Sequence, residues 1–193
     1  MTAPLDRRAV VAALLEGRDR LLVVSGLGSP SYDVMAAGDH DGNYYLWAAM
    51  GSAAMVGFGL ACAQRARPVL VITGDGEALM GLGALATIGA KRPTNLTIVV
   101  LDNGVYGETG MQKSHSSYGL RLERVAAACG FARAERIDDM AGVAALRGRL
   151  ERGEGLAFAA IDIRADAPPR VLPPRDGVHI KNRFRAALGF SPI

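Results

Sequence analysis

The sequence predicts an α/β fold, a doubly wound and mainly parallel sheet with helices on both faces. Short and almost wholly apolar runs occur at residues 21–24, 69–73 and 96–101. Segments with helical spacing separate most of the apolar runs along the chain. Strands without polar alternation are typical of a parallel sheet that is covered on both sides.

The first elements follow from local signals. A helix is predicted at Asp6–Glu16, because its apolar residues recur every three to four positions. The strand Leu21–Val24 ends in a glycine-rich turn, and a helix then starts with Ser29 as its N-cap. The uncharged stretch Gly42–Gln64 is interpreted as a polar loop and then, from Gly51, a tightly packed and fully buried helix.

The later elements alternate in the same way. The strand Val69–Thr73 is followed by one helix from Glu77 to about Ala90, and the strand Leu96–Leu101 comes next. Residues 105–119 have no clear period and are expected to be irregular. The remaining predictions are a helix at Leu122–Cys129, a strand at Phe131–Glu135, a helix at Asp139–Arg152 and a strand at Ala157–Ile163.

The domain organisation is predicted to be simple. Residues 1–165 form one α/β domain, and residues 166–193 form a C-terminal arm rich in proline and arginine. The arm is expected to contain one short helix, at about Val178–Leu188, and to pack on this subunit or on a neighbour.

Composition argues against several classes of protein. The chain has 193 residues, of which half are hydrophobic, so it can bury a full core. The 22 basic and 19 acidic residues form no basic block, so nucleic acid is not an expected partner. Gly42–Gln64 is long enough to span a membrane, but its glycines and polar residues oppose that interpretation, and no membrane contact is expected.

The compartment is predicted from the cysteines and the N-terminus. Cys62 and Cys129 are expected to be buried thiols without a disulfide, which favours a reducing compartment. The N-terminus has no apolar run with a cleavage site, so a signal peptide is not expected. A cytoplasmic location follows as the expectation.

Two turns after neighbouring strands carry the most informative chemistry. Asp75 lies between two glycines after Val69–Thr73, and Asn103 follows the next strand, 28 residues later. Both side chains should therefore emerge at the same edge of the sheet. A carboxylate and an amide oxygen are suitable ligands for Mg²⁺, which also binds phosphate. The helix starting at Glu77 would direct free N–H groups to the same place.

These turns have other possible interpretations. A lone Gly-Asp-Gly is often only a tight turn, but Asn103 at this spacing favours a magnesium-held diphosphate. Gly26-Leu27-Gly28 is half of a dinucleotide-binding fingerprint and lacks its third glycine, which makes it a weak signal. The chain contains no Gly-Lys-Ser/Thr, so a P-loop is excluded.

Gly74-Asp75-Gly76 followed by Asn103 resembles the signature of thiamine-diphosphate-dependent enzymes. The segments 76–88 and 107–115 resemble the sulfopyruvate and phosphonopyruvate decarboxylase branch of that family, and residues 47–51 resemble its turn before a glycine-rich helix. The resemblance implies thiamine diphosphate and Mg²⁺ as cofactors. It also implies decarboxylation of a small 2-oxoacid, most like sulfopyruvate, to an aldehyde and CO₂.

The resemblance assigns roles to individual residues. Asp75 and Asn103 would bind Mg²⁺ through their side chains, and Val105 would bind it through its carbonyl. Cofactor contacts are implied for Gly28, Ser29, Met50, Gly51, Gly74, Asp75, Gly76, Glu77, Asn103, Val105 and Tyr106. Met50 would support the bent shape of the cofactor, although ordinary core packing is the alternative.

Residues 107–115 would face the substrate. Glu108 and His115 are the candidate catalytic residues, with Glu108 handling protons. Lys113 and His115 would meet an anionic substrate tail. The alternative for Glu108 and Lys113 is that they are solvated loop charges.

The resemblance covers only the diphosphate-binding domain of the family. Family enzymes also need a domain that binds the pyrimidine ring, and one sheet already uses residues 5–163. The implied partner is a pyrimidine-binding α subunit, with this chain as the β subunit. The segment Gly42–Gln64 is expected at a subunit interface, in a homodimer or larger assembly. Another reaction on the same cofactor (carboligation or oxidative decarboxylation) and a noncatalytic phosphate-binding assembly subunit stay open as alternatives.

Overall fold

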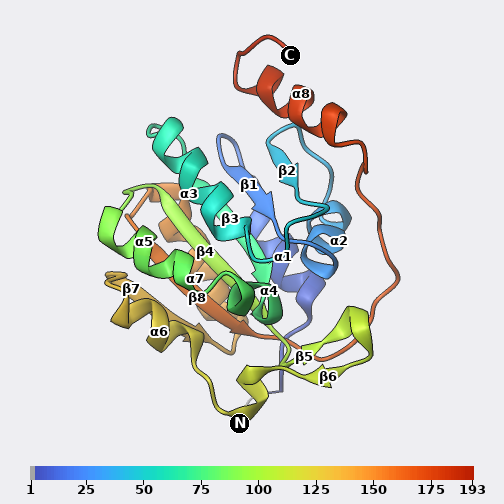
Figure 1. Ribbon diagram of the computed structural model, residues 1–193, viewed down its shortest axis with the longest axis vertical. Coiled ribbons are helices and arrows are strands. Elements are labelled where there is room, and N and C mark those ends of the chain that lie inside the picture. Colours follow the sequence, from blue (N-terminus) through green and yellow to red (C-terminus); the bar gives the residue numbers. More distant parts are fainter. Residues whose placement is uncertain (1–2) are drawn as a thin grey trace.

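The computed structural model describes residues 3–193 and contains a six-stranded sheet between two layers of helices (Figure 1). The strands lie in the order β2-β1-β3-β4-β8-β7, and all neighbouring pairs are parallel. Their bounds are Leu22–Ser25 (β1), Asn43–Tyr45 (β2), Val69–Gly74 (β3), Leu96–Asp102 (β4), Arg133–Ile137 (β7) and Ala157–Asp162 (β8). This arrangement confirms the predicted doubly wound α/β class.

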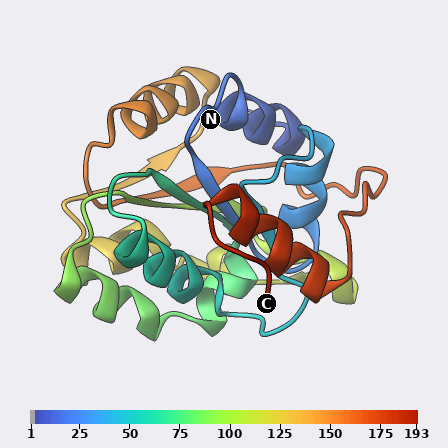
Figure 2. The ribbon, with the colours of Figure 1, turned by 90° about the horizontal axis from the view of Figure 1, so that it is seen from above.

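Helices cover both faces of the sheet, as Figure 2 shows from above. One layer contains α1 (Arg7–Leu15), α2 (Ser29–Ala36) and α7 (Met140–Arg152); the other contains α3 (Ala53–Ala63), α4 (Asp75–Met80), α5 (Gly83–Lys91) and α6 (Leu122–Ala128). The last helix, α8 (Gly177–Ala187), packs beside the edge strand β2. There the rings of Phe184 and Tyr44 meet edge to face, with 5.3 Å between their centroids.

The central strands fill two apolar cores. Every residue of β1 and β4 is buried. In β3, Leu70 and Ile72 belong to the core under α1 and α7, whereas Val69 and Val71 belong to the core under α3 and α5. Both faces of these strands are therefore apolar, which explains why their sequences lack a polar period.

The single helix predicted from Glu77 to Ala90 is wrong, because α4 and α5 are separate helices that meet at Gly81 and Leu82. Gly81 packs on the turn before α3. A Cβ atom at Gly81 would lie 2.0 Å from the carbonyl oxygen of Gly51. The close approach of two backbone segments interrupts a helix that apolar spacing alone predicts to be continuous.

Three predictions about strands also need correction. Residues 43–45 are expected in a loop but form β2, which pairs with β1 over three residues. The strand predicted at Phe131–Glu135 lies two residues later, at β7, because Phe131 instead packs against Phe158, with 6.0 Å between ring centroids. Residues 105–119 are not wholly irregular: they contain the antiparallel pair β5 (Val105–Tyr106) and β6 (Gln112–Lys113).

The helix predicted at Gly51–Gln64 begins at Ala53 and is not fully buried in the single chain. Only Ala53, Gly57 and Ala61 of α3 are buried. Gly57 packs directly on β3, since a Cβ atom there would lie 2.1 Å from Val71 Cγ2. The other face of α3 is open to solvent or to another chain.

The expectation of two buried thiols is also wrong. Cys62 on α3 is exposed and Cys129 is half-buried, and both are free. Cys62 lies on the outward face of α3, and this face is predicted from the sequence to be buried. Within residues 3–193, no helix is long and apolar enough to cross a membrane.

Residues 164–176, called the C-terminal strap below, connect β8 to α8 without helix or strand. The strap passes from the β5–β6 pair along α2 toward α8 (Figure 1). Arg8 Nη2 donates to the carbonyl oxygen of Pro169 at 2.5 Å, and Trp47 Nε1 donates to that of Pro174 at 2.6 Å. The arm therefore packs on its own subunit.

Candidate functional site

The predicted site residues lie at the carboxyl edge of the sheet. From β1 the chain crosses to β2 on one side, and from β3 it crosses to β4 on the other. Such a change of direction leaves a crevice outside the strand ends, which is where α/β sheets bind ligands. The turns at residues 25–29, 74–76 and 102–104 all follow strands that end there.

Asp75 is the first residue of α4 and directly follows β3. Gly74 pairs in register with Leu101, so Asp75 and Asn103 emerge from neighbouring strands. The Asp75 side chain is only 2% exposed and accepts a hydrogen bond from Ser114 Oγ. Burial raises the pKa of Asp75 to about 6. No basic side chain among residues 3–193 pairs with Asp75, so none of these residues compensates its charge.

Asn103 follows β4, and its Oδ1 accepts the N–H of Val105 at 3.0 Å. The preceding carboxylate, Asp102, is also buried and pairs with Arg136 at 3.1 Å. Arg136 Nε also donates to Asp162 Oδ2 at 2.9 Å. One guanidinium group therefore bridges the carboxylates at the ends of β4 and β8, whereas no ion pair within residues 3–193 involves Asp75 at the end of β3.

Glu77 connects three segments of the site. Its Oε2 accepts hydrogen bonds from Leu27 N at 3.1 Å and from Thr73 Oγ1 at 2.8 Å, and its Oε1 accepts one from Gly51 N at 3.3 Å. The side chain is 3% exposed, and burial raises the pKa of Glu77. Gly26 permits this contact, because a Cβ atom there would lie 1.8 Å from Glu77 Oε2. The carboxylate thus holds the turn after β1 and the turn before α3 against β3.

The β5–β6 pair covers the start of α4. Tyr106 lies against Gly76, where a Cβ atom would be 2.5 Å from the tyrosine ring. Val105 pairs with Lys113, and the Tyr106 hydroxyl lies 3.4 Å from His115 Nδ1. One small segment over the Gly-Asp-Gly turn therefore holds four of the predicted residues, namely Val105, Tyr106, Lys113 and His115.

Glu108 lies where the C-terminal strap meets α2. Its Oε1 accepts from Ser29 Oγ at 3.4 Å, and its Oε2 pairs with Arg170 Nη2 at 2.7 Å. Gly28, with φ of +78°, is the N-cap of α2, so the prediction that Ser29 caps this helix is wrong. The Ser29 hydroxyl faces Glu108 instead. A cavity of about 70 Å³ lies among Ser29, Asn103, Glu108 and Arg170.

Met50 stands apart from the other predicted residues. Its side chain is 41% exposed. Its neighbour Gly51, with φ of +97°, turns back to donate to Glu77. The structure therefore brings Gly51 into the network around β3 and leaves Met50 at the surface.

Sequence reasoning missed Ser114, Arg136 and Arg170, and the part that the Glu77 side chain plays. Ser114 and Arg136 carry no sequence signal, because their partners lie 39 and 34 residues away. Arg170 lies in a proline-rich segment without periodicity. The side chain of Glu77 had a weak signal: an acidic residue in an otherwise apolar and glycine-rich segment needs buried partners.

Comparison with known proteins identifies the family. The profile for the C-terminal TPP binding domain of thiamine pyrophosphate enzymes matches residues 32–161. The chain belongs to the thiamine pyrophosphate (TPP) enzymes. The residues matched to this TPP-binding domain include both predicted metal-ligand turns and end within β8.

Several relatives are decarboxylases by name. The chain is 50% identical to the phosphonopyruvate decarboxylase of Streptomyces viridochromogenes over 109 residues, which is 56% of this chain and 27% of that protein. It is 41% identical to sulfopyruvate decarboxylase subunit beta of Methanocaldococcus jannaschii over 114 residues, covering 58% of this chain and 59% of the relative. It is 36% identical to the same subunit of Methanococcus maripaludis, and the alignment covers 65% of this chain and 67% of that subunit.

Solved structures agree on the fold. A thiamin diphosphate-dependent enzyme from Mycobacterium smegmatis superposes with a TM-score of 0.72 at 22% identity, covering 86% of this chain and 33% of that one. This chain spans only about a quarter to three-fifths of the length of three of the decarboxylases that it matches. The TPP-binding domain is thus the part that these proteins share with this chain.

Proposed function

We propose that the carboxyl-edge site binds Mg²⁺ and the diphosphate of TPP. The observation that carries the proposal is the buried carboxylate of Asp75, which has no basic partner in residues 3–193 and follows β3 beside Asn103. With the amide oxygen of Asn103 and the carbonyl of Val105, it offers the oxygen ligands that Mg²⁺ prefers. The remaining magnesium ligands would be phosphate and water.

The surrounding residues fit a diphosphate. Gly74 has no atom within 4 Å of where a Cβ would lie, so a ligand has room beside the strand end. Gly28 and Ser29 lie at the start of α2, where backbone N–H groups and the helix dipole favour an anion. Gly51, Gly76, Glu77 and Tyr106 would shape the rest of this wall, and Met50 would meet the cofactor from the open side.

We infer decarboxylation of a 2-oxoacid with an anionic tail, most like sulfopyruvate, with phosphonopyruvate as the alternative. The names of the relatives and the cations near the site support this substrate class. Bound TPP would supply the electron sink that decarboxylation requires. Glu108 would hold or move a proton, and Lys113 and His115 would bind the sulfonate or phosphonate.

We also propose that residues 1–165 are the cofactor domain, residues 166–193 a supporting arm, and a separate pyrimidine-binding α subunit the catalytic partner. The subunit names of the relatives and the open face of α3 support a shared active site in a homodimer or larger assembly. The two free cysteines are compatible with a cytoplasmic location. Nothing in the charge pattern favours nucleic acid or a membrane surface.

The test is an assay of the chain co-purified with a candidate α subunit, with Mg²⁺ and TPP. Release of CO₂ from sulfopyruvate or phosphonopyruvate by the pair, with no turnover by either subunit alone, is the expected result. Turnover only with an electron acceptor, or only with an acceptor aldehyde, would replace decarboxylation by oxidative decarboxylation or carboligation. A TPP-bound pair inert towards every 2-oxoacid tested would favour a noncatalytic subunit.

A further inference from the structure

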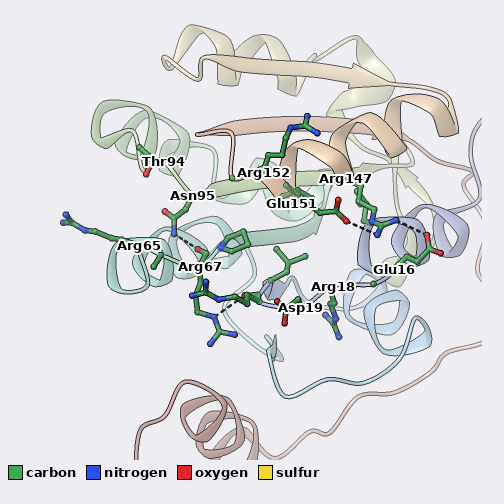
Figure 3. Close-up of a pocket in the computed structure, with 18 residues that line it drawn as sticks. Glu16, Arg18, Asp19, Arg65, Arg67, Thr94, Asn95, Arg147, Glu151 and Arg152 are labelled. Atoms are coloured by element: carbon green, nitrogen blue, oxygen red, sulfur yellow. Dashed lines mark hydrogen bonds and ion pairs between the residues drawn. The ribbon is translucent and has the colours of Figure 1, made fainter.

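A second cavity lies at the opposite edge of the sheet, where the central strands begin. Its volume is about 570 Å³ (Figure 3). Its walls are the loop 16–21 before β1, the loop 65–68 before β3, residues 94–95 before β4, and the last turn of α7. It shares no residue with the carboxyl-edge site.

Arginine dominates the polar lining of this cavity. The charged lining residues are Arg18, Arg20, Arg65, Arg67, Arg147 and Arg152, against Glu16, Asp19 and Glu151. Arg147 pairs with Glu16 at 3.0 Å and with Glu151 at 2.9 Å, so two of the three acids already share one cation. These pairs lie on one side of the cavity, and Arg65 and Arg67 lie on the other (Figure 3).

Three of the arginines are not compensated within the described part of the chain. Arg20, Arg65 and Arg67 pair with no carboxylate among residues 3–193. Within the described residues, Arg67 Nε donates a hydrogen bond to the carbonyl oxygen of Arg20, at 3.2 Å. This contact places Arg20 and Arg67 at the same wall of the cavity, where a bound anion would reduce the repulsion between their charges.

Arginines near helix C-termini often serve only to satisfy the last carbonyl groups. At the C-terminus of α3, the side-chain amide of Asn95 already satisfies these carbonyl groups. Asn95 Nδ2 donates to the carbonyl oxygens of Ala61, Gln64 and Arg67, at 3.3, 3.0 and 2.7 Å. The guanidinium groups of Arg65 and Arg67 are therefore not needed to close that helix. Arg67 lies at the cavity wall, and Arg65 extends outward from the rim (Figure 3).

We propose that this cavity binds a small organic polyphosphate. Guanidinium groups bind phosphate oxygens in paired hydrogen bonds, and at least two of them can act on one chain of phosphates. The organic part would lie against Leu21, Pro68 and Leu150, the apolar part of the wall. The volume is within the range of about 300–1,000 Å³ that is usual for small-molecule sites.

Calorimetric titration of the purified chain tests the proposal, with ATP and with tripolyphosphate, in EDTA so that no metal supports the carboxyl-edge site. Both probes should bind, and Arg65→Gln with Arg67→Gln should weaken binding by about tenfold or more, since each change removes charged hydrogen bonds. Arg124→Gln is the matched control, because Arg124 is also exposed and lies on α6, outside the cavity.

Two further outcomes separate this site from the proposed cofactor site. Asp75→Ala should leave the affinity for ATP unchanged, and added NaCl should lower it. The proposal is overturned if neither probe binds at millimolar concentration. It is also overturned if the double substitution binds as well as the wild type, or if Asp75→Ala removes binding while the arginine substitutions do not. A thermal melt of each variant shows whether it is folded.

Discussion

Glu77 illustrates at the residue scale how one side chain organises the site. Its carboxylate accepts from two backbone N–H groups and one hydroxyl in segments far apart in sequence. We expect Glu77→Ala to lower the free energy of unfolding by about 1–3 kcal/mol, because buried donors lose their acceptor. Urea denaturation measures the loss, and the affinity for Mg²⁺–TPP should fall with it because both turns become free to move.

A control for Glu77→Ala is Glu151→Ala, since Glu151 is 57% exposed and makes a surface ion pair. That change should alter the free energy of unfolding by less than about 0.5 kcal/mol. Equal stability of the two variants would show that the buried hydrogen bonds of Glu77 do not hold the turns.

Single residues were predictable where a motif fixed both their type and their spacing. Asp75 and Asn103 are separated by one strand–helix–strand unit, and the register of Gly74 with Leu101 reproduces that spacing in space. Ser114 and Arg170 were not predictable. Their contacts with Asp75 and Glu108 depend on how a loop and the C-terminal strap fold back, which no local pattern records.

At the scale of elements, the break between α4 and α5 depends on Gly81. We expect Gly81→Ala to destabilise the protein by about 1–3 kcal/mol or more, because the new Cβ would collide with the carbonyl oxygen of Gly51. Gly83→Ala is the matched control: it lies two residues later, with no atom within 4 Å of its Cβ position. That change should be neutral or stabilising by up to about 1 kcal/mol. Similar melting temperatures for both variants would contradict the packing argument.

The C-terminal strap is expected to steady the β5–β6 segment through Arg170 and Glu108. Because this ion pair is partly exposed, Arg170→Ala should change the free energy of unfolding by less than about 1 kcal/mol. Hydrogen exchange in residues 107–113 should nevertheless become faster. Arg175→Ala, at an exposed position of the same strap, should leave exchange unchanged. Equal protection in both variants would mean that the pair does not restrain this segment.

Elements with strong patterns were predictable, and those set by tertiary contacts were not. The apolar runs that became β1, β3, β4 and β8 are unambiguous because both of their faces are buried. The strand β2 has three residues and β5 and β6 have two each, too few for a period. β2 pairs with the distant strand β1, and β5 pairs with β6, so neither pairing has a pattern long enough to be read from composition.

For the whole molecule, the open face of α3 is expected to be an interface between chains. Met55 of α3 is 40% exposed, and Met80, which is 64% exposed, lies against Gly51 in the turn before α3, next to the 41% exposed Met50. A second chain would cover these exposed apolar side chains. Light scattering should show at least a dimer, and Met55→Lys should shift it towards the monomer. Met140→Lys, at a methionine of similar exposure on α7, should not. A monomeric wild type would contradict the interface.

Asp75 is proposed to hold a metal-bound diphosphate, and calorimetric titration of Mg²⁺–TPP is the decisive measurement. Binding should require Mg²⁺, be abolished in Asp75→Ala, be weakened less in Asn103→Ala, and be unchanged in the exposed-site control Asp41→Ala. Asp75→Ala should still fold, because it removes a buried carboxylate that has no basic partner among residues 3–193. Unchanged affinity in folded Asp75→Ala at excess Mg²⁺, or equal binding of TPP by the wild type in EDTA, would contradict the account.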